Sequence, residues 1–206
     1  NWPENRFGEL SVWHEPEIGE DYWIGADVAS GTGKDYSVAQ VLDSNKRQVA
    51  VWRGKIDVRG YADVLFALGL RYNNAKVCVE RNNHGFTVLM RLQHDLLYEN
   101  LYTDVDYGKI TELPTEKLGF FTNAQSKPML IHKLVESLRT GEIKFNHADT
   151  LREMQTFVEH DNGSFADASG KFDDCVMSLA IANHIHDGHW QPVPQDLIEE
   201  FYVEPY

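Results

Sequence analysis

Runs of apolar residues in the first third of the chain predict a small antiparallel sheet. The first strong apolar segment covers residues 22–29, and a turn rich in Gly and Ser follows at 30–35. Residues 36–42 and 48–56 have the pattern of strands, and the polar residues 43–46 form a tight turn between them. Together these segments predict a three-stranded antiparallel meander.

After the meander, the spacing of the apolar positions alternates between that of helices and that of strands. Residues 60–72 carry apolar side chains at helical spacing, and a short β-branched strand follows at 76–80. A second helix is predicted over 86–97 and another strand over 101–105. Residues 106–124 are rich in Gly, Thr and Pro, which predicts an irregular segment.

The last third of the chain is predicted to be mainly helical. A helix is expected over 126–140, where a proline stands in the first turn and a glycine follows the end. A short helix is expected over 151–157 and a hairpin over 157–168. The last helix is expected over 171–187.

This order of elements predicts a single α/β domain. A meander followed by crossovers to parallel strands gives one mixed five-stranded sheet with helices on both faces. Residues 1–20 are polar and are predicted to be an N-terminal linker or arm. The folded domain is expected over 21–189, and residues 190–206 are expected to be an acidic C-terminal tail.

The composition is that of a globular protein that has no membrane partner. Hydrophobic residues make up 42% of the chain and charged residues 25%. No apolar run approaches the roughly 20 residues that cross a bilayer. The first residues lack the basic and apolar regions of a signal peptide, so we do not expect secretion. The chain also lacks an initiator Met, and we expect it to be part of a longer protein.

The net charge of −13 argues against broad phosphate binding by the whole surface. An acidic chain can still act on nucleic acid where metal ions neutralise a carboxylate cluster, and otherwise a partner must supply positive charge. Cys78 and Cys175 lie among apolar residues without a zinc or disulfide spacing. They are predicted to be buried, reduced thiols in a reducing, cytosolic setting.

Four acidic residues stand at the ends of predicted elements. Asp27 lies in an apolar run, where a charge is costly unless it is paired or bound to metal; the alternative is a solvent-facing Asp on an edge strand. Glu80 closes a strand, and the alternative is a surface Glu paired with Arg81. Asp173 and Asp174 open the last helix, where the alternative role is capping.

The predicted topology gathers these acids. A right-handed crossover makes the strand of Glu80 parallel to that of Asp27, so neighbouring strands would project both side chains from one end of the sheet. The last helix can bring Asp173 or Asp174 to that end. Carboxylates so close together repel and persist only where divalent cations hold them. Oxygen ligands without Cys favour Mg²⁺ or Mn²⁺ over zinc.

Three segments carry these acids. They are IGADVASG at 24–31 with KDYS at 34–37, VERNNHG at 79–85, and FDDCVMSLA at 172–180. In this order they resemble the first strand and turn, the second acidic motif and the third acidic motif of the nuclease domain of the large terminase subunit of tailed bacteriophages. The segments and their spacing span about residues 22–187, nearly the whole chain.

The resemblance implies an RNase H-like fold and a two-metal endonuclease that cuts concatemeric double-stranded viral DNA during genome packaging. It implies two Mg²⁺ or Mn²⁺ ions as cofactors. Asp27 is expected to bridge both ions, with Glu80 on one and Asp174 on the other. Asp173 is expected to be a further ligand, a water-mediated contact or the helix cap.

The resemblance also implies partners. In the family an ATPase motor precedes the nuclease domain, and the sequence lacks its Walker A phosphate-binding motif, so the motor is expected outside this chain. The portal and the small terminase subunit are further expected partners. The expected location is the cytoplasm of the infected bacterial host.

Four other side chains are candidates for DNA contact. His84 either steadies the scissile phosphate or simply begins its helix. Lys171 either touches DNA or offsets the charge of the acidic pair after it. Lys127 and Lys133 form either part of a DNA track or a solvated helix face.

Two other functions stay open from the sequence. Another RNase H-like nuclease, such as a Holliday-junction resolvase, a transposase or an RNase H, would use clustered carboxylates in the same way. A non-catalytic docking module, whose acidic tail binds the portal or another subunit, would need no metal. The preferred DNA substrate separates the nucleases, and a metal titration tests the docking module.

Overall fold

The computed structural model describes most of the chain. The described residues are 8–31, 33–81, 83–106, 115–159, 165–167 and 173–188. The main sheet contains the strands β1 (Gly8–Val12), β2 (Tyr22–Asp27), β3 (Ser37–Asp43), β4 (Gln48–Gly54) and β5 (Lys76–Val79). The helices are α1 (Val58–Arg71), α2 (Asn83–Met90), its π-helical continuation η1 (Arg91–Asp95), α3 (Ser126–Arg139), α4 (Ala148–Thr156) and α5 (Asp174–Asp187).

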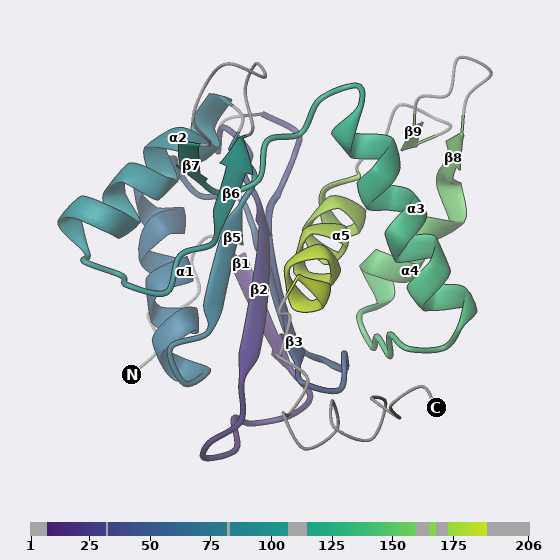
Figure 1. Cartoon of the computed structure of the whole chain (residues 1–206), viewed down its shortest axis with the longest axis horizontal. Helices are drawn as coiled ribbons and strands as arrows, with labels where there is room; N and C mark the ends of the chain where they lie inside the picture. The colour runs from purple at the N-terminus through teal and green to yellow at the C-terminus, as the bar shows by residue number, and fades with distance from the viewer. Residues whose placement is uncertain are drawn as a thin grey trace, which may run out of the picture.

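The sheet is mixed, in the order β1-β4-β3-β2-β5. The pairs from β1 to β2 are antiparallel, whereas β2 and β5 are parallel. Figure 1 shows α1 and α2 on one face of the sheet and α3, α4 and α5 on the other. The predicted fold class, a mixed five-stranded sheet with helices on both faces, is therefore confirmed. Among the described residues, no helix is long and apolar enough to span a membrane.

The two sides of β2 belong to different cores. Ile24 and Ala26 pack in the core that includes α1 and α2, whereas Trp23 packs in the core that includes α3 and α5. Side chains alternate across a strand, so Gly25 and Asp27 face α5 as Trp23 does. The alternation of β2 therefore decides on which face of the sheet the Asp27 carboxyl group stands.

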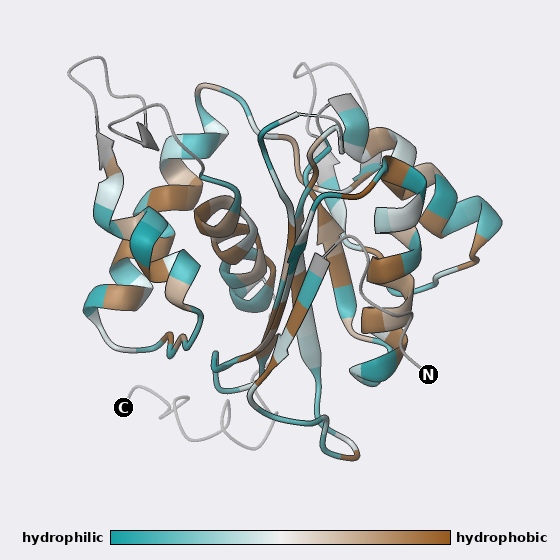
Figure 2. Cartoon of the chain, turned by 180° about the vertical axis from the view of Figure 1, so that it is seen from behind, coloured by the Kyte–Doolittle hydropathy of each residue, from teal (hydrophilic) through white to brown (hydrophobic). Residues whose placement is uncertain are grey.

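α5 packs directly on the backbone of β2 at Gly25. A Cβ at this position would lie under 3.0 Å from backbone atoms of Ser178 and Ala182. Nearly every residue of the helix is buried, and in Figure 2 most of the helix beside the sheet has the brown of hydrophobic residues. The missing side chain of Gly25 thus allows a buried helix to rest on the central strand.

Residues 8–12 lie in the segment predicted to be a linker or arm, and for them that prediction is wrong. They form β1 and pair with β4, with Leu10 opposite Trp52. Leu10 and Val12 pack against the core, while Glu9 is exposed. The strand has only two inward apolar residues and a single partner, so its pattern is too short to stand out from a polar linker.

The fifth predicted strand, at 101–105, does not join the sheet as a strand. Leu101 makes an isolated parallel bridge to Val77 of β5. The following residues form β6 (Thr103–Asp106), which pairs with β7 (Thr115–Leu118) in a separate antiparallel ribbon. β7 comes from the segment predicted to be irregular. Each strand of this ribbon is only four residues long, which is too short for an alternating pattern to stand out in the sequence.

The remaining elements agree with the sequence to within a few residues, and both cysteines are free and buried. The hairpin predicted at 157–168 is present as β8 (Phe157–Glu159) and β9 (Phe165–Asp167). The acidic tail predicted at 190–206 lies outside the described residues.

Replacing Gly25 with Ala should destabilise the fold. The added methyl group meets helix backbone, which cannot move aside as a flexible side chain does, and overpacking of this kind costs about 1–3 kcal/mol or more. Chemical denaturation measures the effect. Gly33→Ala is the matched control, because its Cβ finds no atom closer than 3.4 Å. Equal stability of the two variants would contradict the close approach of α5.

Candidate functional site

Asp27 and Glu80 stand side by side at the end of the sheet. Ala26 and Val79 are paired in the parallel register of β2 and β5, and the amide of Glu80 donates to the carbonyl of Ala26 at 2.9 Å. Asp27 and Glu80 are the next residues on these two strands. The carboxyl group of Asp27 is buried and shares a hydrogen bond with that of Glu80. The predicted meeting of the two acids is confirmed.

The first residue of α5 adds a third carboxyl group. Asp174 is buried, and its Oδ2 accepts a hydrogen bond of 2.9 Å from the backbone amide of Tyr36. Its charge acts on the carboxyl group of Asp27. A contact between segments 138 positions apart in the chain thus holds the start of α5 against the loop before β3.

Asp173 stands at the N-cap position of α5 but does not cap the helix through its side chain. Among the described residues, its side chain makes no capping hydrogen bond, and Oδ2 instead lies 2.8 Å from Nζ of Lys127 in α3. Asp173 therefore occupies the predicted cap position without a capping hydrogen bond from its side chain. Its charge still reaches Asp27 and Asp174.

Burial and the charges of neighbouring acids raise the pKa values of Asp27 and Asp174. The pKa of Asp27 lies well above its usual 3.8, first because the group is buried and then because of the charges of Glu80 and Asp174. Burial also raises the pKa of Asp174 to about 7, against the hydrogen bond from Tyr36, which lowers it. The site therefore resists carrying all its negative charges at once.

The donor chemistry fits a hard divalent cation. The gathered groups are carboxylates, the ligands that Mg²⁺ and Mn²⁺ prefer, and their repulsion is the kind that a cation relieves. As they stand, however, no three acidic, His or Cys side chains among the described residues form a set that could hold a metal ion. Asp27 and Glu80 bond to each other and Asp174 bonds to Tyr36. Binding an ion would require these side chains to turn toward it.

The structure separates the two lysines predicted on α3. Lys127 lies beside the acids because it pairs with Asp173. Lys133 pairs instead with Asp187, at 3.3 Å. Asp187 is the last residue of α5 and lies about 20 Å along the helix axis from Asp174, the first residue. Lys133 is therefore not part of this site.

The other two predicted DNA contacts have different outcomes. His84 is exposed in the first turn of α2, close in the chain to Glu80, and its role in DNA contact stays a prediction. Lys171 lies outside the described residues.

Glu153 of α4 is a residue of the site that the sequence analysis missed. This buried carboxylate accepts hydrogen bonds from the amides of Cys175 at 2.7 Å and Val176 at 3.3 Å. It caps the N-terminus of α5 from another helix, a role that Asp173 leaves unfilled, and so positions Asp174. In the sequence, the only indication is that Glu153 stands three positions after Thr150, so the two residues would share one face of a helix. In the structure both side chains are buried on α4.

A stacked cation is a second missed feature. The guanidinium carbon of Arg53 lies 3.4 Å from the ring centroid of Tyr36, and Nζ of Lys55 lies 4.7 Å from it. The amide of the same Tyr36 bonds to Asp174. The two positive charges therefore lie at the ring of a residue whose backbone contacts the site, and Arg53 also forms an ion pair with Asp149 of α4, at 3.8 Å.

No family model matches the chain. The large terminase nuclease of the thermophilic phage G20c, solved with bound magnesium, is 25% identical with a TM-score of 0.66, over 85% of this chain and 86% of that chain. The Thermus phage P74-26 large terminase nuclease domain is 23% identical with a TM-score of 0.66, over 92% of both chains.

The chain has the large terminase nuclease fold. The resemblance that the three acidic segments carry is thereby confirmed at the level of the fold. In this terminase nuclease fold, the predicted acids Asp27, Glu80, Asp173 and Asp174 come from β2, the end of β5 and the start of α5.

Removing the cap should loosen the start of α5. In Glu153→Ala, two amides of the helix lose their acceptor, which should cost about 1–3 kcal/mol of unfolding free energy. Glu153→Gln keeps an acceptor oxygen and should lose less. Urea denaturation measures both, with Gln155→Ala on the exposed side of the same helix as control. A Glu153→Ala protein as stable as the control would exclude the capping role.

Asp27→Asn should stabilise the metal-free protein, and more so at high pH. The folded protein holds the Asp27 proton more tightly than the unfolded chain, whose carboxyl has a pKa near 3.8. Stability is therefore lost as the pH rises above that value, and Asn avoids the loss. Melting curves in a chelator at about pH 4 and about pH 8 measure the difference. A variant less stable than wild type at the higher pH would count against the repulsion.

Proposed function

We propose that the chain is the nuclease domain of a large terminase subunit, a metal-dependent endonuclease that cleaves double-stranded concatemeric DNA during viral genome packaging. The observation that carries the proposal is the buried Asp27 carboxyl at the end of β2, with the charges of Glu80 and Asp174 upon it. Burying these acids together lowers the stability of the folded protein, because each charge loses its hydration and repels the others. Their presence at one place therefore indicates a functional role.

Divalent cations are the proposed cofactors. Related large terminase nucleases have been solved with bound magnesium and with bound cobalt. In this chain we assign Asp27, Glu80 and Asp174 as ligands of two Mg²⁺ or Mn²⁺ ions, with Asp173 as a further or water-mediated ligand. When bound, such ions lower the pKa of a water molecule and stabilise the leaving oxygen of a phosphodiester.

The chain's own residues orient these groups. The parallel pairing of β2 and β5 places Asp27 beside Glu80, and the capping of α5 by Glu153 sets the direction of Asp174. Lys127, which now pairs with Asp173, supplies a positive charge where the DNA phosphates would lie. Arg53 and Lys55 contact the ring of Tyr36, whose backbone amide holds Asp174.

Cleavage of supercoiled plasmid DNA tests the proposal. Wild type should nick and linearise the plasmid with Mn²⁺ or Mg²⁺ and not in a chelator. Asp27→Asn should lower the rate by about a thousandfold or more, because it removes a charged ligand from both ions. Asp21→Asn, on an exposed acid just before the same strand, should cleave as wild type does.

Three outcomes would reject the proposal. They are metal-independent cleavage, metal-dependent cleavage by Asp27→Asn at the wild-type rate, and no cleavage by wild type with either metal. A resolvase or RNase H activity of the same acids would show as a preference for DNA junctions or RNA hybrids over plain duplex. A docking module would bind no Mn²⁺ in a calorimetric titration.

The wider assignments follow from the same proposal. The ATPase motor would belong to the remainder of a longer terminase subunit. The portal and the small terminase subunit would be its assembly partners, and the cytoplasm of the infected bacterium its place of action. Measuring pull-down of separately purified portal and small subunit by the full-length protein tests these partners.

A further inference from the structure

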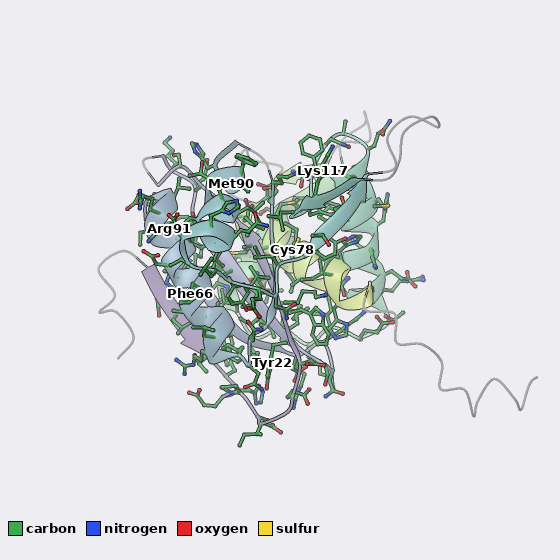
Figure 3. The ribbon with its side chains drawn as sticks, turned by 60° about the vertical axis from the view of Figure 1, so that its left-hand side comes forward. Tyr22, Phe66, Cys78, Met90, Arg91 and Lys117 are labelled. Atoms are coloured by element: carbon green, nitrogen blue, oxygen red, sulfur yellow. The ribbon has the colours of Figure 1, made fainter. Side chains whose placement is uncertain are left out.

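A pocket of about 570 Å³ has Arg81, the residue after Glu80, in its lining and lies on the side of the sheet that carries α2. Its apolar lining comes from Leu89 and Met90 of α2 and from Leu118 of β7. Figure 3 shows Met90 and Lys117 at the end of the molecule opposite to Tyr22, the first residue of β2, and so at the end where Asp27 stands. The volume is in the range of pockets that bind small organic groups.

The rim of the pocket combines two exposed aromatic rings with two cations. Phe86 is 55% exposed and Phe121 is 46% exposed, an unusual degree for this residue type. The guanidinium carbon of Arg81 lies 5.7 Å from the ring centroid of Phe121, and Lys117 completes the lining. Rings that offer a face beside positive charges are the features that bind a base and its phosphate.

The backbone ties this rim to the acids. Arg81 directly follows Glu80, and along an extended strand successive side chains point to opposite faces. The amide of Phe120 donates to the carbonyl of Val79 at 3.0 Å, and the amide of Arg81 donates to the carbonyl of Phe120 at 2.7 Å. Phe120 is thus bonded to the residues on both sides of Glu80, and Phe121, the next residue, is held at the same edge of the sheet.

Gly119 permits this close pairing. Its φ is +71°, and a Cβ there would lie under 3.0 Å from the carbonyl oxygen of Val79. The turn carries the chain from β7 directly onto the edge of β5. The pocket is thus a feature of the fold at this edge, built from the two segments that flank the carboxylates.

We propose that this pocket binds an unpaired nucleobase of the DNA strand held at the carboxylates, with the base stacked on Phe121 and its phosphate near Arg81. The inference rests on the proposed nuclease function and names a part of its substrate. A base inside a duplex is stacked and paired, so it cannot enter a pocket; a frayed, looped or single-stranded one can. The cations and the position one residue from Glu80 favour a nucleotide over an apolar peptide.

Binding of labelled oligonucleotides by Asp27→Asn protein in Mg²⁺ at low salt, measured by fluorescence anisotropy, tests the pocket without cleavage. Adding Phe121→Ala should weaken binding of single-stranded DNA about 5- to 150-fold, the worth of one stacked base. Phe121→Leu should weaken it similarly, because it keeps apolar area and loses the ring. Phe121→Trp should retain the affinity. Binding of a fully paired duplex should change little.

The DNA itself supplies the decisive control. In a series of oligonucleotides with one abasic site moved stepwise, one position should lose the same affinity as Phe121→Ala does, and the two changes together should cost no more than either alone. Leu70→Ala, which trims a 54% exposed side chain of α1, is the protein control.

Additive losses at every position, unchanged binding by Phe121→Ala, full affinity of Phe121→Leu, or no detectable binding of single-stranded DNA would each overturn the proposal. Failure of plasmid cleavage by the wild-type protein would reject the nuclease function instead. The two results are separable because the binding assay uses no cleavage step.

Discussion

The contact between α5 and β2 at Gly25 is the constraint on which the site depends. A helix carrying a buried face can approach the sheet this closely only where the strand has no side chain, and this approach sets the depth and direction of the helix. Asp174 begins that helix and Asp27 ends that strand. The distance between two acids from opposite ends of the sequence is thus fixed by backbone packing.

The buried acids at this edge of the sheet destabilise the fold. Burial raises the pKa of Asp27 and of Asp174, and each carboxyl group is held by another contact, to Glu80 and to the Tyr36 amide. Large apolar cores on both faces of the sheet compensate for this cost. Buried acidic groups with raised pKa values are typical of functional sites, including sites that bind a charged ligand. In this protein the ligand would be a divalent cation.

The distribution of charge explains how an acidic protein can approach DNA. The net charge is −13, yet Lys127 forms an ion pair with Asp173 and Arg81 directly follows Glu80. The local electrostatic field, rather than the net charge of the protein, decides where a DNA backbone binds. The same edge of the sheet then offers carboxylates on one face and an aromatic pocket on the other.

The sequence alone determined the elements with strong periodicity and the acids at their ends, because an apolar run around Asp27 and a strand closing on Glu80 are local patterns. It missed β1, whose two inward residues are too few to show a period, and it placed in the sheet a strand that pairs with β7. Only the tertiary structure decided that Glu153 caps α5, that Asp173 turns to Lys127 and that Lys133 lies far away. These outcomes depend on contacts between elements that are far apart in the sequence. A local pattern shows which face of an element is apolar, but it does not show which other element packs against that face.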